Sequence, residues 1–277
     1  MGDNALRTRL LTAAAILSVL LALIWAPILE FFFALFVTGL AAYGLREYHR
    51  MVEHRQIETE TVGGIIIGAA VTFSGYFHHQ QTLSLALYGG CAAVAILHIV
   101  RGQYSLAGLA CSVFGVLYIG WFGGHVLLLR GIPHAGAGLV TMTIAVVALT
   151  DAAAYVLGSM FGKHRMAPTL SPKKSWEGAI GGFAAALAGM TVIYVLGSVI
   201  GWHAFPAWSL RRYLVIGALL SVAGQAGDLA ESALKRAAGV KDSGTFFPGH
   251  GGVLDRADSY LFVAPLAYYL AAPLFHP

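Results

Sequence analysis

Long apolar segments follow one another along almost the whole chain of 277 residues, and they leave little choice of fold. Hydrophobic residues make up 58% of the sequence and charged residues 11%, whereas soluble domains carry about 25% charged residues. Most apolar runs approach the roughly 20 residues that a helix needs to cross a bilayer, and they are continuous rather than alternating. The sequence therefore predicts an all-α, polytopic integral membrane protein.

Nine membrane-spanning helices are expected. No loop between them is long enough for a soluble domain, so we treat the chain as one continuous membrane domain. Its N-terminal helices occupy residues 1–135, and residues 136–277 form a C-terminal region that carries the polar motifs. The predicted segments, each good to a few residues, are about 10–26, 28–44, 62–77, 82–100, 105–129, 138–161, 178–200, 212–238 and 254–274.

The basic residues indicate how the chain lies in the membrane. With the N-terminus in the cytoplasm, fourteen of the 17 Lys and Arg residues fall on the cytoplasmic side, and only Arg130, Arg211 and Arg212 fall outside. This orientation places both polar motifs on the cytoplasmic face. The net charge of +4 follows from these short loops, so the expected partner is the lipid bilayer and not nucleic acid.

Charged residues gather near the C-terminal end of the chain. Of the 13 carboxylates, five lie between Asp228 and Asp258. Asp228, Glu231, Ser232 and Lys235 are spaced as one face of a helix. Charges kept at membrane depth usually carry function, so this face is expected to line a polar cavity open to the cytoplasm. The alternative is an internal ion pair that only holds helices together.

A glycine-rich segment follows, from Gly239 to Gly252, and it contains five glycines and Pro248. Glycines let backbone N–H groups approach an anion closely, and neighbouring cations neutralise it. The segment is interpreted as a phosphate-binding loop, with a flexible, solvated basic loop as the alternative. The cations around it are Lys235, Arg236, Lys241, His250 and Arg256.

Asp255 and Asp258 begin the last predicted helix. Asp258 is interpreted either as a site residue or as a plain helix cap. Asp255 and Asp228 come from neighbouring helices and lie beside several cations, which is the setting of Mg²⁺ sites in phosphoryl-transfer enzymes. Asp151, a further carboxylate at membrane depth, either lines the same cavity or pairs with a nearby hydroxyl.

A second polar motif, Ser-Pro-Lys-Lys-Ser-Trp-Glu-Gly, occupies residues 171–178. Ser175 is expected to cap the next helix, with Gly178 at its third position. Lys173 and Lys174 are interpreted either as phosphate ligands or as ordinary cytoplasmic loop lysines.

These motifs resemble those of the phosphatidate cytidylyltransferase family, also called CDP-diacylglycerol synthases. The long motif reads S-x-x-K-R-x4-K-D-x-G-x3-P-G-H-G-G-x-x-D-R-x-D from Ser232 to Asp258, and residues 171–178 resemble the second stretch of the family. One departure is Ala257, where the family usually has a bulkier residue or Thr. We expect that difference to alter packing and not chemistry.

The resemblance implies that CTP and phosphatidic acid react to give CDP-diacylglycerol and pyrophosphate. It also implies a dependence on Mg²⁺, with or without a second cation, and a homodimer in the bacterial inner membrane whose active site faces the cytoplasm.

The resemblance also assigns roles to residues. The metal ligands would be Asp228 and Asp255. The catalytic group would be Asp228, Asp255, Lys235, Arg236, Lys241, His250 and Arg256. The substrate-binding group would be Ser171, Lys173, Lys174, Ser175, Glu177, Ser232, Asp242, Gly249, Gly251, Gly252 and Asp258.

Two other classes of function compete with this one. A CTP-dependent polyprenol kinase would share the membrane fold and the nucleotide but would transfer the γ-phosphoryl group. A proton-coupled transporter would also hold carboxylates inside the membrane, although it has no use for a basic, glycine-rich loop between them. A CDP-alcohol phosphotransferase is disfavoured because its D-G-x-x-A-R core is absent.

Overall fold

A computed structural model describes residues 18–102, 104–202, 205–246 and 251–274. Within these residues the protein is almost entirely helical, which confirms the predicted fold class. Residues 18–25 are helical. The N-terminal elements that follow are η1 (Pro27–Leu29), α2 (Glu30–Glu53), α3 (Thr61–Ser74), η2 (Gly75–Phe77), α4 (Gln80–Val100), α5 (Leu106–Gly115), η3 (Val116–Trp121) and α6 (Phe122–Arg130). The C-terminal elements are α7 (Gly136–Phe161), β1 (Arg165–Ala167), β2 (Ser171–Ser175), α8 (Trp176–Tyr194), η4 (Val195–Val199), α9 (Leu210–Ala238), α10 (Leu254–Ala271) and η5 (Ala272–Leu274).

Each of the nine predicted segments corresponds to a helix, although the segment 10–26 is described only from residue 18 onward. Among the described residues, six helices are long and apolar enough to cross a membrane, and Thr61–Phe77 is a shorter apolar helix. The second segment was predicted to end near residue 44, but α2 continues to Glu53. Glu47 and His49 in this extension are buried between helices, whereas Arg46 and Arg50 are exposed.

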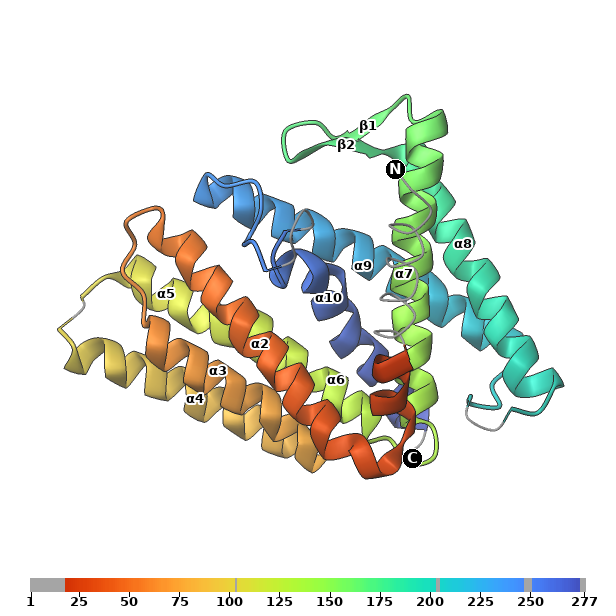
Figure 1. Cartoon of the computed structure of the whole chain (residues 1–277), viewed down its shortest axis with the longest axis horizontal. Coiled ribbons are helices and arrows are strands. Elements are labelled where there is room, and N and C mark those ends of the chain that lie inside the picture. The colour runs from red at the N-terminus through yellow and green to blue at the C-terminus, as the bar shows by residue number, and fades with distance from the viewer. Residues whose placement is uncertain (1–17, 103, 203–204, 247–250, 275–277) are drawn as a thin grey trace, which may run out of the picture.

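The helices form two groups joined by α9 and α10 (Figure 1). The N-terminal group contains α2 to α6, and the other group is the α7–α8 pair. Helix α10 packs against α9, α6 and α7 and also contacts α2, so it connects the two groups. The polar motifs at the ends of α7 to α10 are thereby brought to one region.

Small residues allow α7 and α8 to pack closely along their length. A Cβ atom added to Gly178 would lie 2.7 Å from the Ala154 carbonyl oxygen, and one added to Gly182 would lie 2.5 Å from that of Thr150. This contact between backbones is the packing that the Gly- and Ala-rich sequence of α8 predicts.

A two-stranded hairpin connects α7 to α8. Strand β1 pairs antiparallel with β2, and the hairpin projects from one end of the helix pair (Figure 1). Ser175 ends the hairpin and caps α8, because its Oγ accepts a hydrogen bond from the Gly178 N–H at 3.2 Å. The predicted cap is therefore confirmed. The hairpin was not predicted from the sequence.

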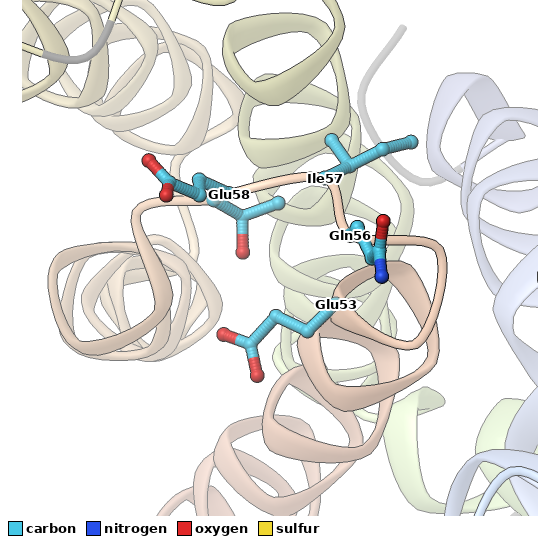
Figure 2. A pocket seen from close by; sticks show the side chains of 5 residues that line it. Glu53, Gln56, Ile57 and Glu58 are labelled. Carbon is cyan, nitrogen blue, oxygen red and sulfur yellow. The ribbon is translucent and has the colours of Figure 1, made fainter.

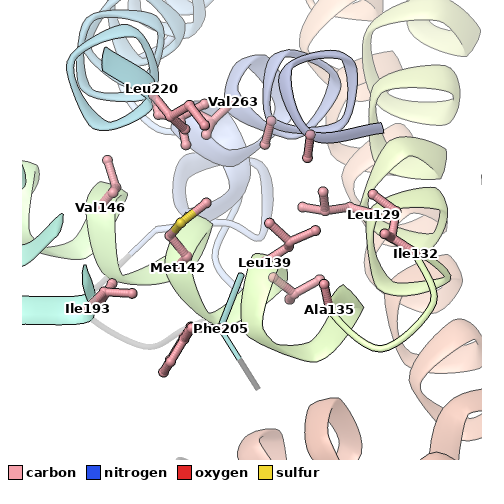
Figure 3. Packing of buried hydrophobic residues seen from close by; sticks show 14 of the residues in the cluster. Leu129, Ile132, Ala135, Leu139, Met142, Val146, Ile193, Phe205, Leu220 and Val263 are labelled. Carbon is pink, nitrogen blue, oxygen red and sulfur yellow. The ribbon is translucent and has the colours of Figure 1, made fainter. Parts of the chain in front are cut away.

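The main hydrophobic core lies between α6, α7, α9 and α10 (Figure 3). Leu129, Leu139, Leu220 and Val263 are almost completely buried there. This core holds the helices that carry the polar residues in a fixed relation to one another. Pro265 lies inside α10 and is also buried.

Candidate active site

A cavity of about 670 Å³ lies where the hairpin meets α7, α8, α9 and the start of α10. Both polar motifs contribute to it, although they are far apart in the sequence. It is lined by Asp151, Ala154, Tyr155, Gly158, Ser159, Gly162, Arg165, Met166, Lys173, Lys174, Ser175, Gly178, Ala179, Gln225, Asp228, Lys235, Asp255, Arg256 and Asp258.

Four carboxylates and five cations line this cavity. The carboxylates come from three helices: Asp151 from α7, Asp228 from α9, and Asp255 with Asp258 from α10. The position of Asp151 confirms the first of its two interpretations. The cations are Arg165, Lys173, Lys174, Lys235 and Arg256. This mixture suits a ligand that carries several phosphate groups, since cations can bind the phosphate oxygens and carboxylates can hold a divalent metal.

Two lysines connect the elements around the cavity. Lys174 of the hairpin pairs with Asp228 of α9, with 2.6 Å between Nζ and Oδ2. Lys235 of α9 pairs with Asp255 of α10 at 2.6 Å and also with Glu231, one turn earlier on its own helix. Each of these ion pairs brings opposite charges together, because a partly buried charge without a partner would cost free energy.

The polar face of α9 was expected either to line a cavity or to form an internal ion pair, and its residues differ in this respect. Asp228 and Lys235 line the cavity, as predicted. Glu231 and Ser232 are buried, with 0% of Glu231 exposed. Glu231 therefore acts in an internal ion pair, which was the alternative interpretation of this face.

The side chain of Asp255 is held by four hydrogen bonds. Oδ1 accepts from Lys235 Nζ at 2.6 Å. Oδ2 accepts from the Gly252 N–H at 2.7 Å and from the Ser243 N–H and hydroxyl, both at 2.9 Å. Charge-assisted hydrogen bonds of this length fix the orientation of a carboxylate. Asp255 is therefore oriented by Lys235 of α9 and by two residues of the glycine-rich segment, Ser243 and Gly252.

Glu47 of α2 contributes to the same region and was not among the predicted site residues. Only 3% of it is exposed, and its carboxylate accepts hydrogen bonds from the Val253 and Leu254 N–H groups. The sequence signal that could have identified Glu47 is a carboxylate next to an apolar helix, because charged residues at membrane depth are rare and usually functional. The neighbouring residues Arg46 and Arg50 made this stretch resemble a cytoplasmic loop.

Other predicted site residues lie away from the cavity lining. Arg236 donates hydrogen bonds to the carbonyl oxygens of Leu170 and Val240. It follows Lys235 directly on the helix, so the two side chains point in different directions. Glu177 accepts hydrogen bonds from His164 and from the Lys163 N–H, and this ties the base of the hairpin to α8.

The remaining predicted residues fall into two sets, and their assigned roles stay predictions. Residues that are described but do not belong to the lining are Ser171, Ser232, Lys241, Asp242, Gly251 and Gly252. Gly249 and His250 lie outside the described residues. Lining residues that the sequence did not single out include Tyr155, Ser159, Arg165 and Gln225.

A second pocket, of about 410 Å³, lies at the end of α2 and in the turn that follows it (Figure 2). It is lined by Glu53, Gln56, Ile57, Glu58 and Thr59, and none of these residues is a cation. Two carboxylates without a cation would repel a phosphorylated ligand, so the cavity at the hairpin is the better candidate.

The predicted metal ligands, Asp228 and Asp255, both line the cavity. Carboxylate oxygens are the ligands that Mg²⁺ prefers, so the chemistry of this pair fits the ion. In the part of the chain that the structure describes, no three or more His, Cys, Asp or Glu side chains are gathered closely enough to hold a metal. Asp228 pairs with Lys174 and Asp255 pairs with Lys235, so a bound cation would share each carboxylate with a lysine.

The fold and the cavity define an integral membrane protein with a charged site at one end of its helix bundle. The chain belongs to the cytidylyltransferase family, whose model matches residues 7–274. It is 34% identical over 277 residues to a phosphatidate cytidylyltransferase of Brucella suis biovar 1 (strain 1330), covering 98% of this chain and 95% of that protein. Proteins of the same name from Bacillus subtilis (strain 168) and Synechocystis sp. (strain ATCC 27184 / PCC 6803 / Kazusa) are 35% and 31% identical, covering 69% and 83% of this chain and 68% and 85% of theirs.

Proposed function

We propose that this protein transfers the cytidylyl group of CTP to phosphatidic acid and releases CDP-diacylglycerol and pyrophosphate. The observation that carries the proposal is the cavity, which joins the two polar motifs within a member of the cytidylyltransferase family. Relatives that match almost the whole chain bear the name of this activity. The many apolar helices suit a lipid substrate that stays in the bilayer.

The reaction needs positioning and charge neutralisation more than it needs a strong base. An oxygen of the lipid phosphate attacks the α-phosphorus of CTP, and the bond from that phosphorus to the bridging oxygen of the β-phosphate breaks. The pyrophosphate leaves with the bonding electrons. Lys173, Lys174, Lys235 and Arg256 line the cavity and would neutralise the phosphates while these bonds change.

Mg²⁺ belongs to the same proposal. Asp228 and Asp255 would hold the ion, because they are carboxylates from different helices that line one cavity. When bound, Mg²⁺ supplies positive charge to the phosphate oxygens. The hydrogen bonds to Asp255 from Ser243 and Gly252 keep its carboxylate in a fixed orientation.

We further propose that the protein is a homodimer in the bacterial inner membrane, with the cavity open to the cytoplasm. The distribution of basic residues supports this orientation. CTP is a cytoplasmic nucleotide, and the orientation gives it direct access to the site. Chemical cross-linking in membranes, followed by measurement of the mass in detergent, would test the dimer.

The activity is tested with purified protein in detergent, phosphatidic acid, Mg²⁺ and CTP labelled at either the α- or the γ-phosphate. We expect label from the α-phosphate in the lipid product and label from the γ-phosphate in pyrophosphate. Label from the γ-phosphate in a lipid would instead indicate a kinase. CTP left intact with several lipids would overturn the proposal.

The metal assignment is tested with Asp228→Asn and Asp255→Asn in the same assay. Both substitutions are expected to lower kcat by at least about a hundredfold, because a carboxamide is a poor ligand for Mg²⁺. EDTA should abolish activity, and added Mg²⁺ should restore it. Lys163→Ala is a matched control, since Lys163 lies near the hairpin but does not line the cavity. Full activity in both Asn variants would disprove the metal site and leave the reaction intact.

A further inference from the structure

Glu47 lies on α2, yet its carboxylate contacts residues in and directly after the glycine-rich segment, near the other end of the chain. Oε1 accepts a hydrogen bond from the Val253 N–H at 3.1 Å, and Oε2 accepts one from the Leu254 N–H at 2.8 Å. The Ser243 hydroxyl lies 3.2 Å from Oε2. Ser243 follows α9, whereas Val253 is the N-cap of α10 and Leu254 is its first residue. One buried side chain therefore joins a residue within the glycine-rich segment to the two residues that directly follow it.

The loop has room for this carboxylate only because two of its residues are glycines. A Cβ atom added to Gly244 or to Gly252 would collide with the carboxylate oxygens of Glu47. These two glycines are therefore explained by the approach of Glu47, in addition to any approach of a phosphate group. The two N–H donors belong to the N-cap and the first residue of α10, where free N–H groups and the helix dipole favour a negative charge.

Ser243 connects Glu47 to the cavity. Its hydroxyl lies 2.9 Å from Asp255 Oδ2 and 3.2 Å from Glu47 Oε2. A hydroxyl has one proton, so it donates to one of these carboxylates at a time. Its backbone N–H donates to Asp255 as well. The position of Asp255 therefore depends on the segment that Glu47 holds.

We propose that Glu47 is a positioning residue for the cytidylyl transfer: it holds Ser243 and the start of α10 together, and it thereby fixes the orientation of Asp255 in the cavity. Glu47 does not line the cavity, so it acts through the residues that it binds. The expected effect on kinetics rests on the proposed function, whereas the contacts of Glu47 are independent of it.

The test compares Glu47→Gln with Glu47→Asp. Glutamine has the same shape but places an NH₂ group where a carboxylate oxygen accepted a backbone N–H, so one hydrogen bond becomes a contact between two donors. Aspartate keeps both acceptor oxygens on a shorter side chain. Glu60→Gln is the matched control, because Glu60 is also fully buried in the N-terminal group but pairs with Arg101 at 2.6 Å.

The first readout is hydrogen–deuterium exchange of the peptide that covers residues 251–258, measured by mass spectrometry on the purified protein. Exchange of the Val253 and Leu254 amides is expected to accelerate about tenfold or more in Glu47→Gln, since their acceptor is impaired. It should stay unchanged in Glu60→Gln. This measurement needs no activity, so it tests the contact even if the proposed reaction is wrong.

The second readout is steady-state kinetics with each substrate varied in turn. A misplacement of about 1 Å can cost about a hundredfold in rate, so kcat is expected to fall about 30- to 100-fold in Glu47→Gln. The KM for phosphatidic acid should change less than about threefold, and Glu47→Asp should recover part of kcat. An unchanged exchange rate, an unchanged kcat, or equal losses in Glu47→Gln and Glu60→Gln would each overturn the inference.

Discussion

Two buried carboxylates near the cavity are compensated in different ways. Glu231 is paired with the cation of Lys235, whereas Glu47 accepts hydrogen bonds from two backbone N–H groups and shares the Ser243 hydroxyl with Asp255. Removing one member of a buried ion pair leaves an uncompensated charge, which costs more than replacing both members. Lys235 therefore has two separable roles, since it also pairs with Asp255.

The two roles of Lys235 can be separated by substitution. Lys235→Met leaves Glu231 buried without a cation, and we expect a loss of about 3–5 kcal/mol in stability, seen as a lower thermal unfolding midpoint in detergent. The double variant Lys235→Met/Glu231→Gln should recover much of the midpoint. Activity should stay low in both variants, because neither restores the cation beside Asp255.

Glu231→Gln alone serves as the comparison. It should lower the midpoint less than Lys235→Met, since Lys235 keeps Asp255 as a partner. A double variant no more stable than Lys235→Met would contradict the assignment of Glu231 to a stabilising ion pair.

The sequence could predict contacts between residues that are close together in the chain, but not contacts between residues that are far apart. Ser175 was recognised as a helix cap because the N–H that it binds is three residues away. Glu47 was missed because its partners lie 196 to 207 residues further along the chain. From the sequence, Asp151 could either line the cavity or pair with a nearby hydroxyl. The packing of α7 against α9 decides between the two.

At the scale of elements, the apolar segments predicted the helices well, because length and hydropathy alone decide them. The hairpin of β1 and β2 was missed, since Ser171, Pro172, Lys173 and Lys174 have little strand propensity. Its position depends instead on contacts with other elements. Glu177 binds the backbone at its base, and Arg236 binds the Leu170 carbonyl oxygen near its turn.

The close packing of α7 against α8 determines where the hairpin and Asp151 lie. We expect Gly182→Leu to separate these helices, because its first side-chain atom would already lie 2.5 Å from the Thr150 carbonyl oxygen. Overpacking of this kind costs about 1–3 kcal/mol, and the displaced cavity wall should lower activity at least about tenfold. Thermal unfolding and the assay of lipid product would measure both effects.

Gly89→Leu is the control for this substitution. Gly89 is an exposed glycine of α4, and an added Cβ would meet nothing within 4 Å. It should leave the unfolding midpoint and the activity nearly unchanged. Equal effects of the two leucines would mean that a larger side chain in any helix is enough to cause the loss.

At the scale of the whole molecule, the cavity lies at one end of the helix bundle, and this end has to face the supply of nucleotide. The hairpin precedes α8, and residues 205–209 lie between η4 and α9 in the sequence. The helix that contains both α8 and η4 has 24 residues, which corresponds to about 36 Å at 1.5 Å per residue. A helix of that length can cross a bilayer, so we expect the hairpin and residues 205–209 to lie on opposite sides of the membrane.

Labelling of single cysteines tests this arrangement. Thr169 of the hairpin and Ala207 of the opposite segment are both exposed, and the two native cysteines, Cys91 and Cys111, are free thiols that can be replaced by alanine. In intact cells a membrane-impermeant maleimide should label Ala207→Cys and not Thr169→Cys, because the basic residues put the hairpin in the cytoplasm. Inside-out vesicles should give the reverse pattern. Activity of the cysteine-free background shows that the fold is retained. If Thr169→Cys were labelled from outside the cell, the cavity would face away from cytoplasmic CTP, and both the orientation and the proposed substrate would have to be abandoned.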